Sequence, residues 1–140
     1  MPTVKRLVLI YNADWSLLGG LKYAAHRLKT GEDPCALCAL TYDGVSENKA
    51  WKSCRLEFGV PVDAVYKNKV SDAMAAAAGH NYPCVLAETE SGFTAIAAHD
   101  AFSGCLEARD QVSCLAELLR AGLARAGLEL SADSLGAEAH

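Results

Sequence analysis

The chain has 140 residues, of which 51% are hydrophobic and 21% are charged. A chain of this length forms one domain that buries roughly two-thirds of its unfolded surface, and this composition excludes a disordered, collagen-like or coiled-coil chain. Thirteen basic and seventeen acidic residues give a net charge of −4, the wrong sign for binding a phosphate backbone, so we expect no nucleic-acid partner.

The sequence also carries no pattern that directs a chain to a membrane. No window approaches about 18 unbroken apolar residues, and the N-terminal residues lack the long apolar stretch and the cleavage site of a signal peptide. We therefore expect a soluble, cytoplasmic protein with no membrane partner. We expect a single α/β domain over residues 1–130 and a frayed, small and polar tail over residues 131–140.

The first half of the chain alternates between strand and helix patterns. Residues 4–11 form an almost unbroken apolar and β-branched run, which is typical of a central strand buried on both faces. Leucine and alanine recur at helical spacing over 15–29 and predict an amphipathic helix. Residues 38–42 fit a second strand, and Ser46 is positioned to cap a helix that Gly59 ends.

The second half continues the alternation and closes with a hairpin and a helix. Residues 60–66 predict a strand, and an alanine-rich helix follows over 71–79. Residues 84–88 and 93–97 read as a β-hairpin with a four-residue loop. The last long helix is expected over 110–126, with its apolar side chains on one face. This order predicts a mixed sheet with helices on both faces.

This order of elements, with Pro83 just before the hairpin, resembles the thioredoxin fold. The resemblance implies a three-layer α/β arrangement, a mixed sheet with a C-terminal β-hairpin and a closing helix, in which Pro83 is cis and faces the active site. Trp15 occupies the place of the tryptophan that precedes the family's C-x-x-C. Ser16 and Gly19 then occupy the two thiol positions, so the family's usual thiol pair is missing from its usual place.

Two short motifs are similar to those of a small, uncharacterised bacterial family. Residues 11–14 read Y-N-A-D and residues 35–41 read C-x-L-C-x-L-T. The resemblance implies no established activity. The phosphate-binding pattern G-x-x-x-x-G-K-[ST] is absent from the sequence.

Cys35 and Cys38 form a C-x-x-C motif, whose two thiols can close a disulfide ring or hold one metal ion. Since the pair follows Pro34 and leads into a predicted strand, we expect it to lack the activation that a helix N-terminus gives a thiol. A strand–helix–strand unit would place Cys35 at the opposite end of the sheet from Asn12 and Trp15.

Our leading hypothesis is a displaced C-x-x-C that binds metal or exchanges thiols and disulfides. In the redox version Cys35 and Cys38 are the catalytic residues, either one can be the attacking thiolate, and the partner is a small thiol or a protein. The alternative is a structural pair, because cysteines often serve as small buried hydrophobes.

In the metal version the ion would be zinc, which needs four ligands in a structural site. Cys35 and Cys38 supply two of them, and the others could come from Cys54, His26 or a second chain, so that a homodimer would complete the site. Cys54 falls on an apolar helical stripe and is expected to be buried, whereas His26 is expected to face water.

A second hypothesis is a non-catalytic module that binds a small ligand or a peptide. Asn12, Asp14, Trp15 and Ser16 follow the first strand, and open α/β sheets gather ligands at the carboxyl ends of their strands. The same residues can instead cap and cover the following helix.

The remaining cysteines carry weaker signals. Pro83 and Cys84 would join the ligand edge in the thioredoxin-like arrangement, where the Cys84 thiol could react, although its apolar neighbours favour a buried, inert residue. The separation of Cys105 and Cys114 does not place them on one helical face, and we assign them no role.

Overall fold

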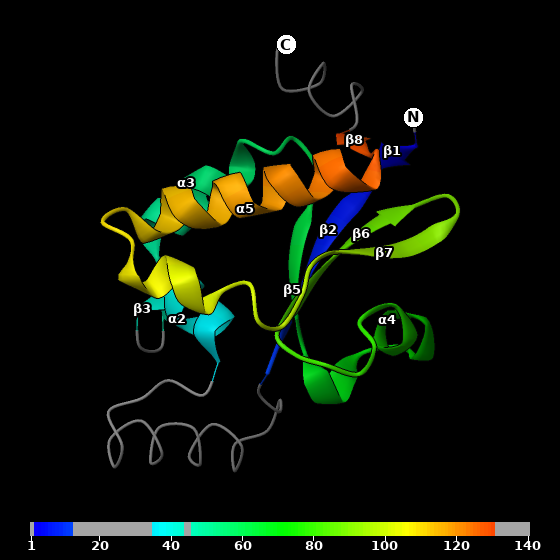
Figure 1. Ribbon diagram of the computed structural model, residues 1–140, viewed down its shortest axis with the longest axis horizontal. Helices are drawn as coiled ribbons and strands as arrows, with labels where there is room; N and C mark the ends of the chain where they lie inside the picture. The colour runs from blue at the N-terminus through cyan, green and yellow to red at the C-terminus, as the bar shows by residue number, and fades with distance from the viewer. Residues whose placement is uncertain (1, 13–34, 44–45, 131–140) are drawn as a thin grey trace.

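The computed structural model describes residues 2–12, 35–43 and 46–130, so the predicted helix over 15–29 and the tail over 131–140 lie outside the described residues. Within these ranges the main sheet is mixed and four-stranded, in the order β5-β2-β6-β7 (Figure 1). Strand β2 is parallel to β5 and antiparallel to β6, and β6 is antiparallel to β7. The strands are β5 (Val62–Tyr66), β2 (Arg6–Tyr11), β6 (Cys84–Thr89) and β7 (Gly92–Ala97).

Strand β2 is the buried centre of this sheet, as its apolar sequence predicts. Its residues from Leu7 to Tyr11 are all buried. The predicted run over 4–11 is interrupted at Lys5, because Thr3–Val4 forms a separate strand, β1, that pairs in parallel with β8 (Glu129–Leu130). Strand β5, predicted over 60–66, lies at the sheet edge and is only half-buried.

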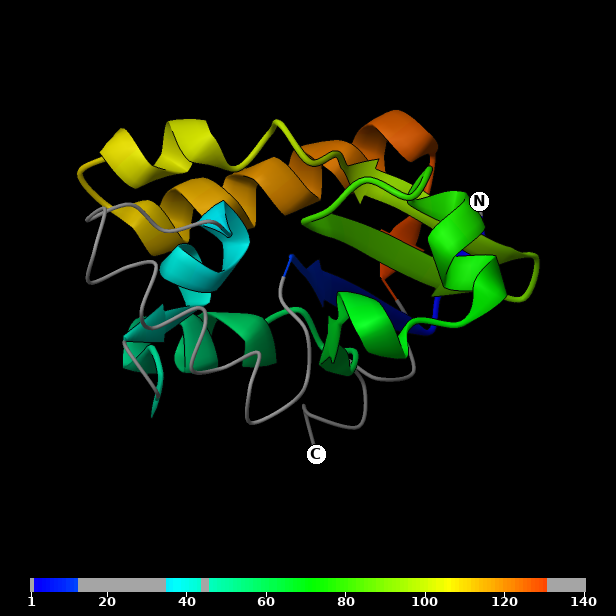
Figure 2. The same ribbon diagram turned by 90° about the horizontal axis from the view of Figure 1, so that it is seen from below.

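Helices cover both faces of the sheet (Figures 1 and 2). One face packs against α2 (Ala36–Thr41), α3 (Lys49–Leu56) and α5 (Gln111–Ala126) in the larger core. The other face packs against α4 (Asp72–Ala77) in a smaller core. The remaining short elements are β3 (Tyr42–Asp43), β4 (Ser46–Glu47), η1 (Lys67–Lys69) and η2 (Ser103–Glu107). The predicted mixed α/β sheet is therefore confirmed for the described residues.

Side chains cap the N-terminal ends of α4 and α5, the two helices whose observed ranges agree most closely with the predicted ones. Ser71 Oγ accepts a hydrogen bond from the Met74 amide at 3.2 Å and caps α4. Asp110 Oδ1 accepts one from the Ser113 amide at 3.0 Å and caps α5. The hairpin is also confirmed, but its loop is shorter than predicted, because Thr89 pairs with Gly92 and leaves two residues between the strands.

The predicted strand over 38–42 is wrong, because residues 36–41 form helix α2. A short apolar run fits a buried strand and a buried helix equally well. Here Ala36, Leu37 and Leu40 are strong helix formers, and the sulfur of Cys35 caps the helix by accepting the Cys38 amide. Leu37, Leu40 and Thr41 then share the buried face at helical spacing.

The predicted cap at Ser46 is also wrong. Ser46 pairs in the short strand β4, and the helix begins three residues later, at Lys49. Asn48 caps α3 instead, and its Oδ1 accepts a hydrogen bond from the Trp51 amide at 3.0 Å. Asparagine is as good a helix cap as serine, so local sequence does not separate the two positions.

Helix α5 reaches the sheet closely at Gly122. A Cβ atom there would lie 2.9 Å from the carbonyl carbon of Ile96 in β7 and closer still to its oxygen. Relieving this clash would require the backbone of α5 or of β7 to move, and both are packed in the core. We expect Gly122→Ala to lower the free energy of unfolding by about 1–3 kcal/mol, despite the better helix propensity of alanine, as measured by urea denaturation.

Gly104→Ala is the matched control, because a Cβ atom on Gly104 meets nothing within 4 Å. We expect this variant to stay within about 0.5 kcal/mol of the wild type. Equal stability of Gly122→Ala and the wild type would contradict the close approach of α5 to β7.

Candidate functional site

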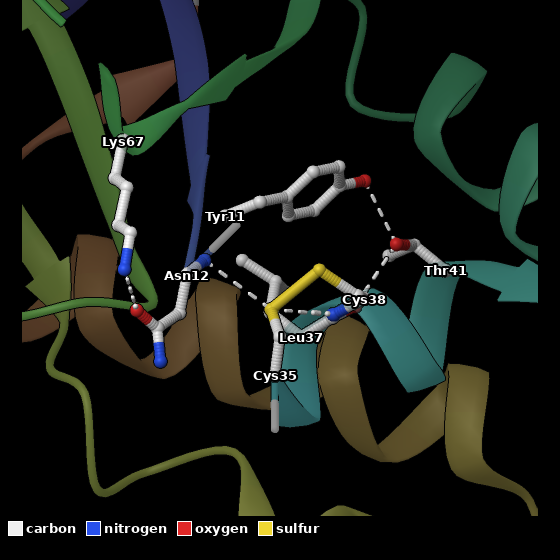
Figure 3. Close-up of a disulfide and its surroundings, with 7 residues drawn as sticks. All are labelled: Tyr11, Asn12, Cys35, Leu37, Cys38, Thr41 and Lys67. Carbon is white, nitrogen blue, oxygen red and sulfur yellow. Dashed lines mark hydrogen bonds between the residues drawn. A yellow bond between two sulfur atoms is a disulfide. The ribbon is translucent and has the colours of Figure 1, made fainter. Parts of the chain in front are cut away.

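The carboxyl ends of the two parallel strands carry the polar residues of the site. Tyr11 ends β2 and pairs with Tyr66, which ends β5. The next residues are Asn12 and Lys67, and Lys67 Nζ donates a hydrogen bond to Asn12 Oδ1 at 3.3 Å (Figure 3). The backbone N–H of Asn12 donates to the sulfur of Cys35 at 3.4 Å. Asn12 therefore connects the end of the sheet to the C-x-x-C motif.

The expectation that Cys35 lies far from Asn12 is wrong. That expectation required a strand over 38–42 as the parallel partner of the first strand. The partner is β5 instead, and α2 brings Cys35 back to the end of β2 at which Asn12 stands. Asp14, Trp15 and Ser16 lie outside the described residues.

Cys35 and Cys38 are joined by a disulfide at the beginning of α2, with their Cα atoms 5.2 Å apart (Figure 3). Cys35 has an extended backbone and occupies the position that caps the helix. Its sulfur accepts the backbone N–H of Cys38 at 3.2 Å. We expected the pair to lie away from a helix N-terminus. That expectation is wrong, because the segment predicted as a strand over 38–42 belongs to helix α2.

The two sulfurs differ in their surroundings. Cys35 is 0% exposed, whereas Cys38 is 9% exposed. Cys35 accepts two backbone N–H groups, from Asn12 and from Cys38. Hydrogen bonds from N–H groups favour the charged form of an acceptor. When the disulfide opens, these two N–H groups act in favour of the thiolate of Cys35, whereas its burial acts against the thiolate.

A buried tyrosine and a buried threonine pack beside the disulfide (Figure 3). The Thr41 hydroxyl donates its single hydrogen to the Leu37 carbonyl at 2.9 Å. Tyr11 is therefore the donor in its 2.8 Å contact with the Thr41 oxygen. Burial raises the pKa of Tyr11, which keeps the phenol protonated and able to donate. The Tyr11 ring also makes edge contacts with Tyr42 and Tyr66, each with centroids 5.9 Å apart.

Cys84 does not join the disulfide. The Tyr82–Pro83 peptide bond is cis, and Cys84 begins β6 opposite Ile10. Cys84 is 1% exposed and packs with Met74 in the smaller core, on the face of the sheet away from Cys35. Burial raises its pKa from the ordinary 9.0 to about 11. Cys84 is therefore a buried, unreactive thiol.

The zinc expectation needs ligands beyond Cys35 and Cys38. Within residues 2–12, 35–43 and 46–130, no group of three or more His, Cys, Asp or Glu side chains is placed to hold a metal ion. Cys54 is half-buried on α3 rather than fully buried as predicted, and burial raises its pKa. His26 lies outside the described residues.

Two further features were not predicted from the sequence. Cys105 in η2 and Cys114 in α5 form a second disulfide, with Cα atoms 5.6 Å apart. Their spacing suggested no pairing because they lie on different elements, which only the turn between η2 and α5 brings together. Lys67 was also missed, although its place after a predicted strand that could be parallel to the first was a usable signal.

Comparison with known proteins finds no protein similar to this chain. No family model matches the chain, and neither a curated protein nor a solved structure matches it. In the part of the chain that the structure describes, no helix has both the length and the apolar character needed to cross a membrane.

The Tyr11–Thr41 hydrogen bond generates a prediction about stability. Thr41→Val removes the acceptor and leaves the buried Tyr11 hydroxyl without this partner, which costs about 1–3 kcal/mol of unfolding free energy. Tyr11→Phe removes the hydroxyl itself, and Thr41 still donates to Leu37, so we expect a smaller loss. Urea denaturation measures the unfolding free energy of both variants. A larger loss for Tyr11→Phe than for Thr41→Val would show that the donor is assigned wrongly.

The surroundings of Cys84 predict slow alkylation. Since its folded pKa is about 11, nearly all of this thiol is protonated at about pH 8, and the thiolate is the reactive form. We expect iodoacetamide to label half-buried Cys54 well before Cys84 in the native protein, and to label both at similar rates in urea. Mass spectrometry of the peptides at successive times measures which of the two cysteines is labelled first. Faster native labelling of Cys84 would contradict its burial.

Proposed function

We propose that this chain is a thioredoxin-like domain that catalyses reversible thiol–disulfide exchange through the displaced pair Cys35 and Cys38. One observation carries the proposal. The two sulfurs are bonded to each other beside the end of the central strand, and Cys35 accepts two backbone N–H groups there. A pair that can close a disulfide and favour a thiolate when it opens has the two properties that exchange requires.

The strand arrangement supports the thioredoxin-like part of the proposal. A first strand lies between a parallel partner and an antiparallel hairpin, and a helix closes the domain. The resemblance implies a thiol pair near the carboxyl end of the first strand. In this chain the pair stands later in the sequence, but the hydrogen bond from Asn12 to Cys35 brings it to that same end.

The proposed reaction conserves atoms and electrons. Two molecules of a small thiol give up two electrons and two protons and form one disulfide. The Cys35–Cys38 bond breaks, and each cysteine becomes a thiol. The reverse reaction oxidises the dithiol at the expense of an external disulfide. The chain supplies the paired sulfurs and the N–H donors that favour the charged intermediate.

The proposal predicts catalysed exchange between glutathione and a low-molecular-weight disulfide. We expect the wild-type protein to accelerate glutathione oxidation in this assay. Replacing both residues, Cys35→Ser with Cys38→Ser, should reduce the rate to that of the uncatalysed reaction, because no sulfur pair remains to form the intermediate.

The second disulfide offers a matched control. Replacing Cys105→Ser and Cys114→Ser removes one disulfide as well, but outside the site, so activity should persist in the folded variant. Loss of activity only in the Cys105/Cys114 variant, or no acceleration by the wild type, would refute exchange at Cys35 and Cys38.

A further inference from the structure

We infer that exchange at this site has a fixed direction, in which Cys38 is the sulfur that a small external thiol attacks and Cys35 is the leaving sulfur. This inference rests on the proposed function and adds to it the order of the two steps and the class of partner. The order is opposite to a scheme in which the first cysteine of the motif meets the partner.

Access decides which sulfur is attacked. An attacking thiolate must reach the sulfur along the axis of the disulfide, and exchange rates depend on that access. Both residues lie in the larger core, but residue Cys38 as a whole keeps 9% of its exposure, whereas Cys35 keeps none. Such limited access at Cys38 favours a small monothiol over the folded surface of a protein.

The hydrogen bonds decide which sulfur leaves. When an external sulfur bonds to Cys38, the electron pair of the broken bond passes to Cys35. A leaving thiolate departs faster when it is stabilised, and the N–H groups of Asn12 and Cys38 donate to Cys35. Asn12 is in turn held by Lys67, which donates to its side chain. Attack in the opposite direction would leave the charge on Cys38, for which no such pair of donors is observed among the described residues.

The two steps balance as follows. In the first, the thiolate RS⁻ bonds to Cys38, the Cys35–Cys38 bond breaks, and Cys35 leaves as a thiolate. In the second, another RS⁻ attacks the sulfur of R in the mixed disulfide, which releases R–S–S–R and the Cys38 thiolate. The two cysteine thiolates then take up the two protons that the external thiols lost. In the reverse direction Cys35 attacks the mixed disulfide on Cys38.

The direct test maps the mixed disulfide on the wild-type protein. The oxidised protein is mixed briefly with glutathione, quenched with acid, alkylated, and analysed by peptide mass spectrometry. We expect glutathione on Cys38 and the alkyl group on Cys35. Glutathione on Cys35 with alkylated Cys38 would overturn the order while leaving the proposed function intact. An intact disulfide after prolonged exposure would refute the proposed function itself.

Single variants give an independent reading if the mixed disulfide is too short-lived to map. The Cys35→Ser variant keeps the sulfur of the residue with slight exposure, and the Cys38→Ser variant keeps that of the fully buried residue. With glutathione disulfide we expect Cys35→Ser to form its adduct at least about tenfold faster than Cys38→Ser. Equal or reversed native rates would overturn the inference. In urea the two rates should converge, which shows that the fold, and not the thiol, makes the difference.

Discussion

The site depends on the position of strand β2 at the centre of the sheet. Five consecutive residues of this strand, from Leu7 to Tyr11, are buried, and both of its edges are hydrogen-bonded, to β5 on one side and to β6 on the other. Strand β2 forms five residue pairs with each of these neighbours, which sets its register from both sides. This register fixes where the strand ends, and the Asn12 amide that follows is fixed with it.

Helix α2 is hydrogen-bonded to the residues at this end of β2. Cys35 caps the helix with its sulfur and also accepts the Asn12 amide, so one atom joins the helix to the sheet. The Tyr11–Thr41 hydrogen bond joins the same two elements at the last residue of the helix, six residues after Cys35. These contacts hold the disulfide between two rigid elements, which is the arrangement that a preorganised redox pair requires.

The sequence predicted the elements whose patterns are long or marked by caps. The apolar run over 4–11 and the helices predicted over 71–79 and 110–126 agree with β2, α4 and α5, and the structure adds the caps at Ser71 and Asp110. Residues 36–41 do not agree with the predicted strand, because a mostly apolar run of six residues is too short for its period to separate strand from helix. That single error also misplaced Cys35, since the location of the pair depended on which segment is parallel to the first strand. The C-x-x-C itself was evident, whereas the contact with Asn12 depends on tertiary structure.

An exchanging pair and a structural disulfide at Cys35 and Cys38 differ in their reduction potential. Equilibration of the protein in glutathione buffers of graded potential, followed by alkylation and peptide mapping, measures the midpoint of this pair. We expect a midpoint above about −300 mV, within the range in which thiols and disulfides of small molecules exchange with proteins. A pair that stays oxidised below about −300 mV, as structural disulfides do, would contradict it.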